Sequence, residues 1–278
     1  MPALDAARYT GYLRLTACLR QGRTTLAESI GTGAYKPSRL VEAEGAAGAL
    51  LYLMNPGGGF VDGDRYRLEI AAEARAELAV TTQSATKVYK TPRDCVRSDT
   101  EIRIAAGALV ELLPDPVIAY ADARYFQRTR ICLEPGASVI VADAWTPGWS
   151  PSGAPFTYER IDSLTELYLD GELKARDRLA LVPSAGGEWD DLDGFTHYGS
   201  LLAVHEKADA AAQDKLAQHL AERLEGSGIR FGLTRLDMAG CMLRVMAGST
   251  EQLRLAIDVC HGYIRREWLG KPPLRLRK

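Results

Sequence analysis

The chain has 278 residues, of which 46% are hydrophobic and 25% are charged. These values are typical of a folded protein with one large domain or two ordinary ones. The formal net charge is only −2, with 34 lysines and arginines against 36 aspartates and glutamates, so composition gives no electrostatic footprint for nucleic acid or an anionic membrane.

Nothing in the sequence indicates secretion or membrane insertion. There is no apolar N-terminal segment, and no apolar run approaches the roughly 20 residues that a membrane-spanning helix needs. The five cysteines are scattered and contain no C-x-x-C pair, which favours free thiols in a reducing compartment. We therefore expect a cytoplasmic protein.

Short apolar strands separated by turns fill residues 1–194, at spacings of about 8–12 residues. The clearest runs are 12–19, 24–30, 50–54, 66–70, 78–80, 108–113 and 138–144. Residues 158–169 and 173–182 predict a long hairpin over Asp170-Gly171, a strong two-residue turn signal. Residues 184–193 are small, acidic and glycine-rich and predict an exposed loop. The pattern predicts a mainly β fold, either a β-helix-like stack of coiled sheets or a sandwich.

The last third, residues 195–278, changes character. Asp209 can cap a helix that carries an apolar residue at every fourth position from Ala212 to Leu224, and Ser249 with Gln252 resembles a capping box before a second helix. Strands are expected at 195–204, 229–236 and 241–245. The order β-α-β-β-α predicts an α+β cap with two helices, packed as one continuous unit with the β-rich body of residues 1–194.

The most unusual stretch begins where the apolar run 50–54 ends. Asn55-Pro56 is followed by Gly57-Gly58-Gly59 and then by the turn Phe60-Val61-Asp62-Gly63-Asp64. Three consecutive glycines allow positive φ and close backbone approach. A tight hairpin is one interpretation. A phosphate cradle is weakly supported, because no G-x-x-x-x-G-K-[ST] pattern is present.

Three blocks of the sequence resemble the urease accessory protein D family. The first is N-P-G-G-G-x-x-x-G-D from Asn55, the second is T-T-Q-S-A-T-K-V-Y-K from Thr81, and the third is E-L-L-P-D-P-V-I from Glu111, followed by an arginine-rich segment. The resemblance implies a β-rich, helically winding fold with C-terminal helices. It also implies a non-enzymatic maturation factor that binds apo-urease, an F-type accessory protein and a G-type GTPase. An internal polar tunnel for nickel is a further implication.

A nickel path must bind its cargo weakly enough to release it, so isolated carboxylates, amides and hydroxyls suit it better than clustered histidines or cysteines. The candidates in the family-like blocks are Asp64, Gln83, Ser84, Thr86, Lys87, Glu111 and Asp115. Asp64 and Glu111 flank apolar runs, where a carboxylate needs a partner. For Asp115 the alternative to a role in the path is that of an ordinary turn residue. For Lys87 the alternative is a lysine at a strand edge that reaches solvent. Asp143 is a further carboxylate of interest.

The four histidines, His197, His205, His219 and His261, form no H-x-H or H-x-x-x-H pair, so no tight metal site is predicted. His219 and His261 are interpreted as exposed or packed residues. No tightly bound cofactor is expected, and nickel would bind only transiently. No residue pattern predicts a catalytic nucleophile.

Two other functions stay open: a polysaccharide-acting β-helical enzyme with paired carboxylates, and a purely structural interaction scaffold. For partner contacts, Tyr263 and Trp268 on the last helix are the candidates.

Overall fold

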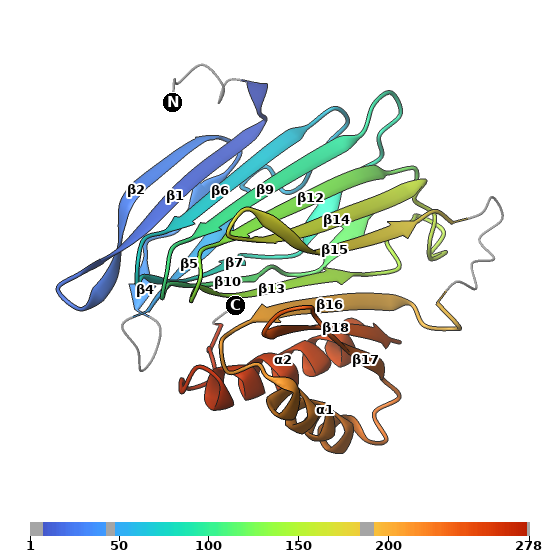
Figure 1. The fold of residues 1–278 in the computed structure, drawn as a ribbon. Helices are drawn as coiled ribbons and strands as arrows, with labels where there is room; N and C mark the ends of the chain where they lie inside the picture. Colours follow the sequence, from blue (N-terminus) through green and yellow to red (C-terminus); the bar gives the residue numbers. More distant parts are fainter. Residues whose placement is uncertain (1–7, 43–47, 184–191, 277–278) are drawn as a thin grey trace.

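The computed structural model describes residues 8–42, 48–183 and 192–276. Two β-sheets lie face to face, and two helices pack on the outside of one of them (Figure 1). The fold is therefore mainly β with C-terminal helices, as predicted. Of the loop expected over 184–193, residues 184–191 lie outside the described part of the chain.

The first sheet has seven strands among the described residues. Their spatial order is β15 (Glu172–Leu181), β14 (Arg160–Leu169), β12 (Arg124–Leu133), β9 (Val96–Ile104), β6 (Arg65–Ala72), β1 (Gly11–Arg20) and β2 (Arg23–Gly33). The second sheet is larger. Its main path is β17 (Arg230–Arg235), β18 (Gly240–Ala247), β16 (His197–Val204), β13 (Ser138–Trp145), β10 (Leu109–Leu113), β7 (Glu77–Thr82), β5 (Ala49–Met54) and β3 (Lys36–Pro37). Off this path lie β4 (Val41–Glu42), β8 (Thr86–Val88) and β11 (Val117–Ala119).

From β5 to β14 the long strands alternate between the two sheets, with the short strands β8 and β11 added to the second sheet, and neighbouring long strands within each sheet run parallel. Tyr66 pairs with Ser98 between β6 and β9, while Leu78 pairs with Val110 between β7 and β10. Each pair of successive strands is thus one coil of a solenoid-like stack. Antiparallel strands flank the stack on both sides, and β16 pairs with β13, so the strands on either side of the predicted boundary at residue 195 share a sheet.

The main core lies between the sheets, because alternate side chains of every strand point inward. Leu13, Ile102, Val110 and Ile131 are all fully buried there. Strand β13 is buried on both faces, since the helices cover its outer side. This double burial explains why 138–144 reads as a nearly continuous apolar run instead of an alternating one.

Both predicted helices form, with the predicted caps. Helix α1 (Ala210–Leu224) begins after Asp209, whose side chain accepts a hydrogen bond of 2.8 Å from the backbone N–H of Ala212. Helix α2 (Thr250–Glu267) begins after Ser249, which accepts from Gln252 N–H at 3.2 Å. No helix in the described part of the chain is long and apolar enough to cross a membrane.

Two expectations need correction. The strand expected to end at Ile30 continues as β2 to Gly33, because antiparallel pairing with β1 extends as far as Gly11. Trp268, a partner-interface candidate, is only 2% exposed and packs in the apolar layer between α2 and the second sheet, so it offers no surface to a partner. Tyr263 is half-buried, and its ring lies 4.8 Å from that of His219 on α1.

Candidate functional site

The glycine loop after β5 is clamped against β8. The backbone N–H of Phe60 donates to Lys87 O, and the N–H of Tyr89 donates to Phe60 O, both at 2.8 Å. Gly59 adopts a φ of +158°, and a Cβ there would lie 2.6 Å from the Tyr89 ring and 2.8 Å from Lys87 O. Only glycine fits so close an approach. The expected hairpin is wrong, because β5 and β6 on either side of the loop lie in different sheets. The close backbone approach that glycine permits is present at Gly59, and the loop forms one wall of a hollow.

This first hollow has a volume of about 140 Å³. Its walls are the glycine loop on one side and the segment from Thr82 to Lys87 on the other. Four predicted residues line it, namely Gln83, Ser84, Thr86 and Lys87. Gln83, Ser84 and Lys87 are exposed, so their uncharged polar groups and one cation face open space.

A second hollow of about 270 Å³ shares Gln83 and Ser84 with the first. It adds Asp115, which follows β10, and Arg254 from helix α2. Asp115 is 7% exposed, and its Oδ1 lies 3.3 Å from Arg254 Nη2. The backbone N–H of Asp115 donates to Thr82 Oγ1 at 2.8 Å, and that hydroxyl lies 3.3 Å from Asp115 Oδ2. Asp115 thus combines a turn role with a place in the site.

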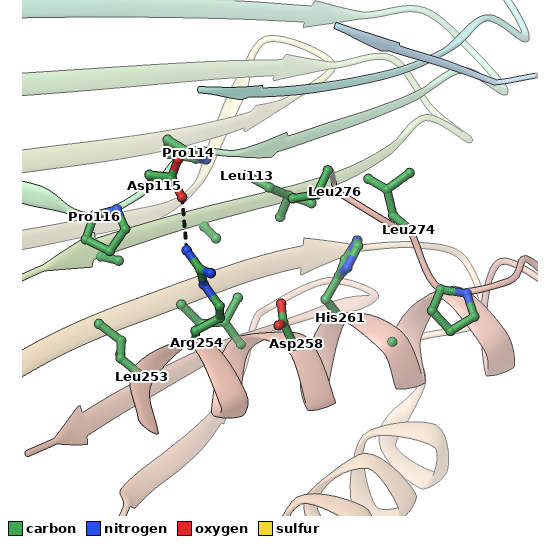
Figure 2. Close-up of a pocket in the computed structure, with 15 residues that line it drawn as sticks. Leu113, Pro114, Asp115, Pro116, Leu253, Arg254, Asp258, His261, Leu274 and Leu276 are labelled. Carbon is green, nitrogen blue, oxygen red and sulfur yellow. Dashed lines mark hydrogen bonds and ion pairs between the residues drawn. The ribbon is translucent and has the colours of Figure 1, made fainter. Parts of the chain in front are cut away.

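The third hollow, of about 410 Å³, is larger than the other two and lies between helix α2 and the end of β10 (Figure 2). Figure 2 shows Arg254, Asp258 and His261 projecting from one side of the helix toward the strands. The C-terminal residues Leu274 and Leu276 line the far end. Asp115 and Arg254 border both this hollow and the second. The three hollows therefore adjoin one another through shared lining residues, from the glycine loop to His261, and we call them together the groove. Polar and apolar side chains both line it.

Glu111 lies behind the groove. It is 3% exposed on β10, where its Oε2 lies 2.6 Å from His261 Nε2, and it also pairs with Arg265. Burial alone would raise the pKa of Glu111, but the hydrogen bond from His261 and the nearby positive charges outweigh it and lower that pKa. Glu111 is therefore a paired structural anion, separated from the groove by His261.

The same cluster holds the C-terminal tail in place. Arg265 Nε donates to Pro272 O at 2.7 Å, and Lys271 Nζ lies 2.8 Å from a carboxylate oxygen of Glu77 on β7. These contacts fix the course of the chain after α2. They place Leu274 and Leu276 at the end of the groove.

Asp64 lies apart from the groove. Its carboxylate accepts hydrogen bonds from Thr10 Oγ1 at 3.0 Å, Val61 N–H at 2.8 Å and Tyr66 Oη at 3.1 Å. Asp64 lines none of the three hollows. Its acceptor sites are used to close the turn that enters β6, so the structure places it among the structural residues of the glycine motif.

A partly buried acid, Asp143, lies between the sheets. Asp143 points inward from β13 and accepts a hydrogen bond of 2.9 Å from Gln127 Nε2 on β12. Burial raises the pKa of Asp143 to about 6, and the charge of Asp177 adds to the effect, while the Gln127 hydrogen bond offsets only part of it. Asp143 therefore lies apart from the groove.

Sequence reasoning missed the contribution of helix α2. Arg254, Asp258 and His261 follow a spacing of four and three, which places them on one helix face, and that spacing was the available signal. The apolar positions of the same helix drew attention instead. Within the described ranges, no group of three or more His, Cys, Asp or Glu side chains is arranged to hold a metal ion.

Stacked parallel sheets and a helical pair on one outer face define a β-solenoid-like protein, with an open groove at their junction. The chain belongs to the family of UreD urease accessory proteins, whose family model matches residues 9–278. It is 38% identical over 277 residues to the urease accessory protein UreD of Lachnoclostridium phytofermentans, covering 97% of this chain and 98% of the relative.

Two further relatives carry the same description. The chain is 40% identical over 270 residues to the urease accessory protein UreD of Bacillus sp. strain TB-90, with 97% of this chain and 98% of the relative covered. It is 35% identical over 284 residues to that of Paenarthrobacter aurescens, with 99% and 97% covered. The family resemblance of the three sequence blocks is thus confirmed over nearly the whole chain.

Proposed function

We propose that this protein is a cytoplasmic, non-enzymatic maturation factor. It binds apo-urease together with an F-type and a G-type accessory protein, and its groove forms part of the route by which nickel reaches the urease active site. The observation that supports this role is the set of adjoining hollows. It joins Gln83, Ser84, Thr86 and Lys87 to Asp115, two family-like blocks of the sequence.

The chemistry of the lining suits transient passage. Nickel binds nitrogen and sulfur ligands tightly, so a route with clustered histidines would retain it. Hydroxyl and amide oxygens bind the ion weakly, and the carboxylate of Asp115 is partly neutralised by Arg254 at 3.3 Å. Beyond Asp115 the groove also presents Asp258 and His261 to an ion. The hydroxyl and amide oxygens of the segment from Gln83 to Thr86 support nickel as a transient cargo.

The groove can be blocked by a bulky side chain at an exposed position, so that no interaction of a buried residue is lost. Ser84 is exposed and lines both the first and second hollows, so Ser84→Trp would fill their junction. We expect this variant to form the complex with the urease proteins but to lower nickel-dependent urease activation by about tenfold or more, because the route is obstructed. The assay reconstitutes apo-urease, the F-type and G-type proteins, GTP and nickel.

Ser29→Trp is the matched control, because Ser29 is an exposed serine on β2 outside all three hollows. It should activate urease as the wild type does. Full activation by Ser84→Trp would assign the protein a scaffold role without a nickel route. Full activation in the absence of this chain would overturn the maturation role itself.

A further inference from the structure

The outer face of the seven-stranded sheet carries a surplus of positive charge. Strand β12 contributes Arg124, Arg128 and Arg130 to this face, because Tyr125 and Ile131 between and beside them point into the core. The adjacent strands add Arg97, Arg103, Arg160, Arg176 and Arg178. The carboxylates on the same faces of β9, β12, β14 and β15 are Asp99, Glu101, Asp162 and Glu166. We call this surface the arginine face.

Its excess of charge arises because single carboxylates serve two arginines. Asp162 pairs with Arg160 at 2.6 Å and with Arg178 at 2.7 Å. Glu166 lies 2.6 Å from Arg128 and 3.3 Å from Arg176.

The hydrogen bond from Arg178 is the main cause that lowers the pKa of Asp162, and the one from Arg128 does the same for Glu166. Both acids are therefore ionised at neutral pH, and each trio keeps one net positive charge.

Two exposed arginines of this face have no carboxylate partner among the described residues. The guanidinium of Arg97 lies 5.2 Å from the ring centroid of Phe126, and that of Arg130 lies 4.5 Å from the ring centroid of Tyr168. Stacking on an aromatic ring holds the planar group in place while leaving its N–H donors free. A pre-positioned guanidinium is suited to bidentate contact with an incoming carboxylate.

The arginine face is open and contrasts with the rest of the chain. Helices α1 and α2 cover the other sheet, and no described helix covers this one (Figure 1). Eight arginines stand against four carboxylates on these strands, and Glu159 beside β14 pairs with Arg124 at 3.3 Å. The whole chain nevertheless has a net charge of −2, so the rest of the chain is net negative. An asymmetric charge distribution of this kind accelerates and orients association with an oppositely charged surface.

We propose that the arginine face is a docking surface for an acidic protein surface. This inference rests on the proposed function, because it takes the acidic partner to be one of the three urease-maturation proteins. A protein partner fits better than nucleic acid, since Asp99, Glu101, Asp162 and Glu166 would repel a uniform run of phosphates. A protein surface can place its carboxylates opposite the free arginines and its own bases opposite these acids.

The test uses Arg97→Glu with Arg130→Glu, which changes the two arginines that hold no ion pair. Binding of the full chain to cognate apo-urease, F-type protein and G-type protein is measured separately by biolayer interferometry. We expect the double variant to bind one of the three proteins at least about tenfold more weakly than the wild type does, mainly because association is slower. The affinity of the wild type for that protein should fall as NaCl is raised from about 0.1 to about 0.5 M. Arg97→Gln with Arg130→Gln should give an intermediate loss.

The control changes charge equally on the opposite side of the molecule. Lys215→Glu with Arg223→Glu alters two exposed bases of helix α1 and should leave binding to the same partner unchanged. Urea unfolding of every variant checks the fold. Binding to a duplex DNA probe is measured alongside. If the arginine variants bind all three proteins as the wild type does, or lose only DNA binding, the inference is overturned while the maturation role stands. Wild-type protein that binds none of the three would overturn both.

Discussion

Glu111 and His261 are separated by 150 residues in the sequence, yet their side chains are joined by a contact of 2.6 Å between strand β10 and helix α2. Because a carboxylate can only accept, Nε2 of His261 carries the proton in this contact. The neighbouring Arg265 pairs with the same carboxylate. Three buried polar groups thus connect the helical layer to the sheet and also fix the tail that ends the groove.

Glu111→Gln should destabilise the protein by about 3–5 kcal/mol, because it leaves the Arg265 guanidinium, itself 2% exposed, without its anion. Urea unfolding at neutral pH measures the loss. Glu73→Gln is the control, since Glu73 is exposed with no side-chain hydrogen bond or ion pair among the described residues, and it should change stability by less than about 0.5 kcal/mol. Equal stability of the two variants would show that Glu111 is not a structural anion.

Asp143→Asn should alter the pH dependence of stability. The folded-state pKa of Asp143 is about 6, above its ordinary value of 3.8, so the folded protein holds this proton more tightly than the unfolded chain. Stability from this group is therefore full below about pH 4 and is lost as pH rises through 6, by about 1–3 kcal/mol. The variant lacks this loss and should gain stability over the wild type between pH 4.5 and pH 7.5.

Urea unfolding at those two pH values gives the comparison. Asp237→Asn is the control, because Asp237 is an exposed turn residue, and its difference from the wild type should be the same at both pH values. A pH-independent difference for Asp143→Asn would contradict the raised pKa.

Gly59→Ala should disturb the groove, whereas Gly58→Ala should not. Both glycines have positive φ, but a Cβ at Gly58 meets nothing within 4 Å, while one at Gly59 would approach Lys87 O to 2.8 Å. Backbone strain of about 1 kcal/mol is common to both. We expect a greater loss of urease activation for Gly59→Ala at equal amounts of folded protein. Equal activation by both variants would argue against a wall formed by this loop.

Gly171→Ala should cost about 1 kcal/mol of folding free energy. Gly171 follows Asp170 in the turn between β14 and β15, with φ angles of 80° and 51°. Nothing lies within 4 Å of a Cβ at Gly171, so the cost comes from the backbone alone. Gly232→Ala on β17 also adds a methyl group to open space, at an ordinary φ, and should be neutral or stabilising in thermal unfolding. Equal effects of the two changes would contradict this assignment.

Local signals predicted the parts of the fold that depend on local chemistry. Asp170-Gly171 gave the hairpin and Asp209 gave the first cap, because each depends on neighbours within a few residues. The pairing of parallel strands could not be predicted from the sequence. Strands β6 and β9 pair although a whole coil of the solenoid separates them in sequence, and no local signal specifies such a pairing. Strand β2 continues through Gly31 to Gly33, although glycines there predicted its end, because pairing with β1 satisfies the backbone hydrogen bonds beyond Ile30.

The site was predictable where its residues are close in sequence. Gln83, Ser84 and Thr86 lie in one segment and do line one hollow. Arg254 was missed because it reaches Asp115 from 139 residues away. Asp64 is a candidate for the path because a buried acid beside an apolar run needs a partner. Its three hydrogen bonds are local and it lines none of the three hollows, so its role in the path stays a prediction. The arginine face could not be predicted from the net charge of −2, because that sum does not show where the charges lie on the folded chain.

The double burial of β13 has a consequence for biosynthesis. Ile140, Ala142 and Ala144 form an apolar outer surface, and helix α2 packs on it. Because α2 follows every strand in the sequence, a chain cut before Thr250 keeps all the strands but leaves this surface bare. Exposed apolar surface of this kind promotes aggregation. Messages truncated before Thr250 should therefore yield inclusion bodies.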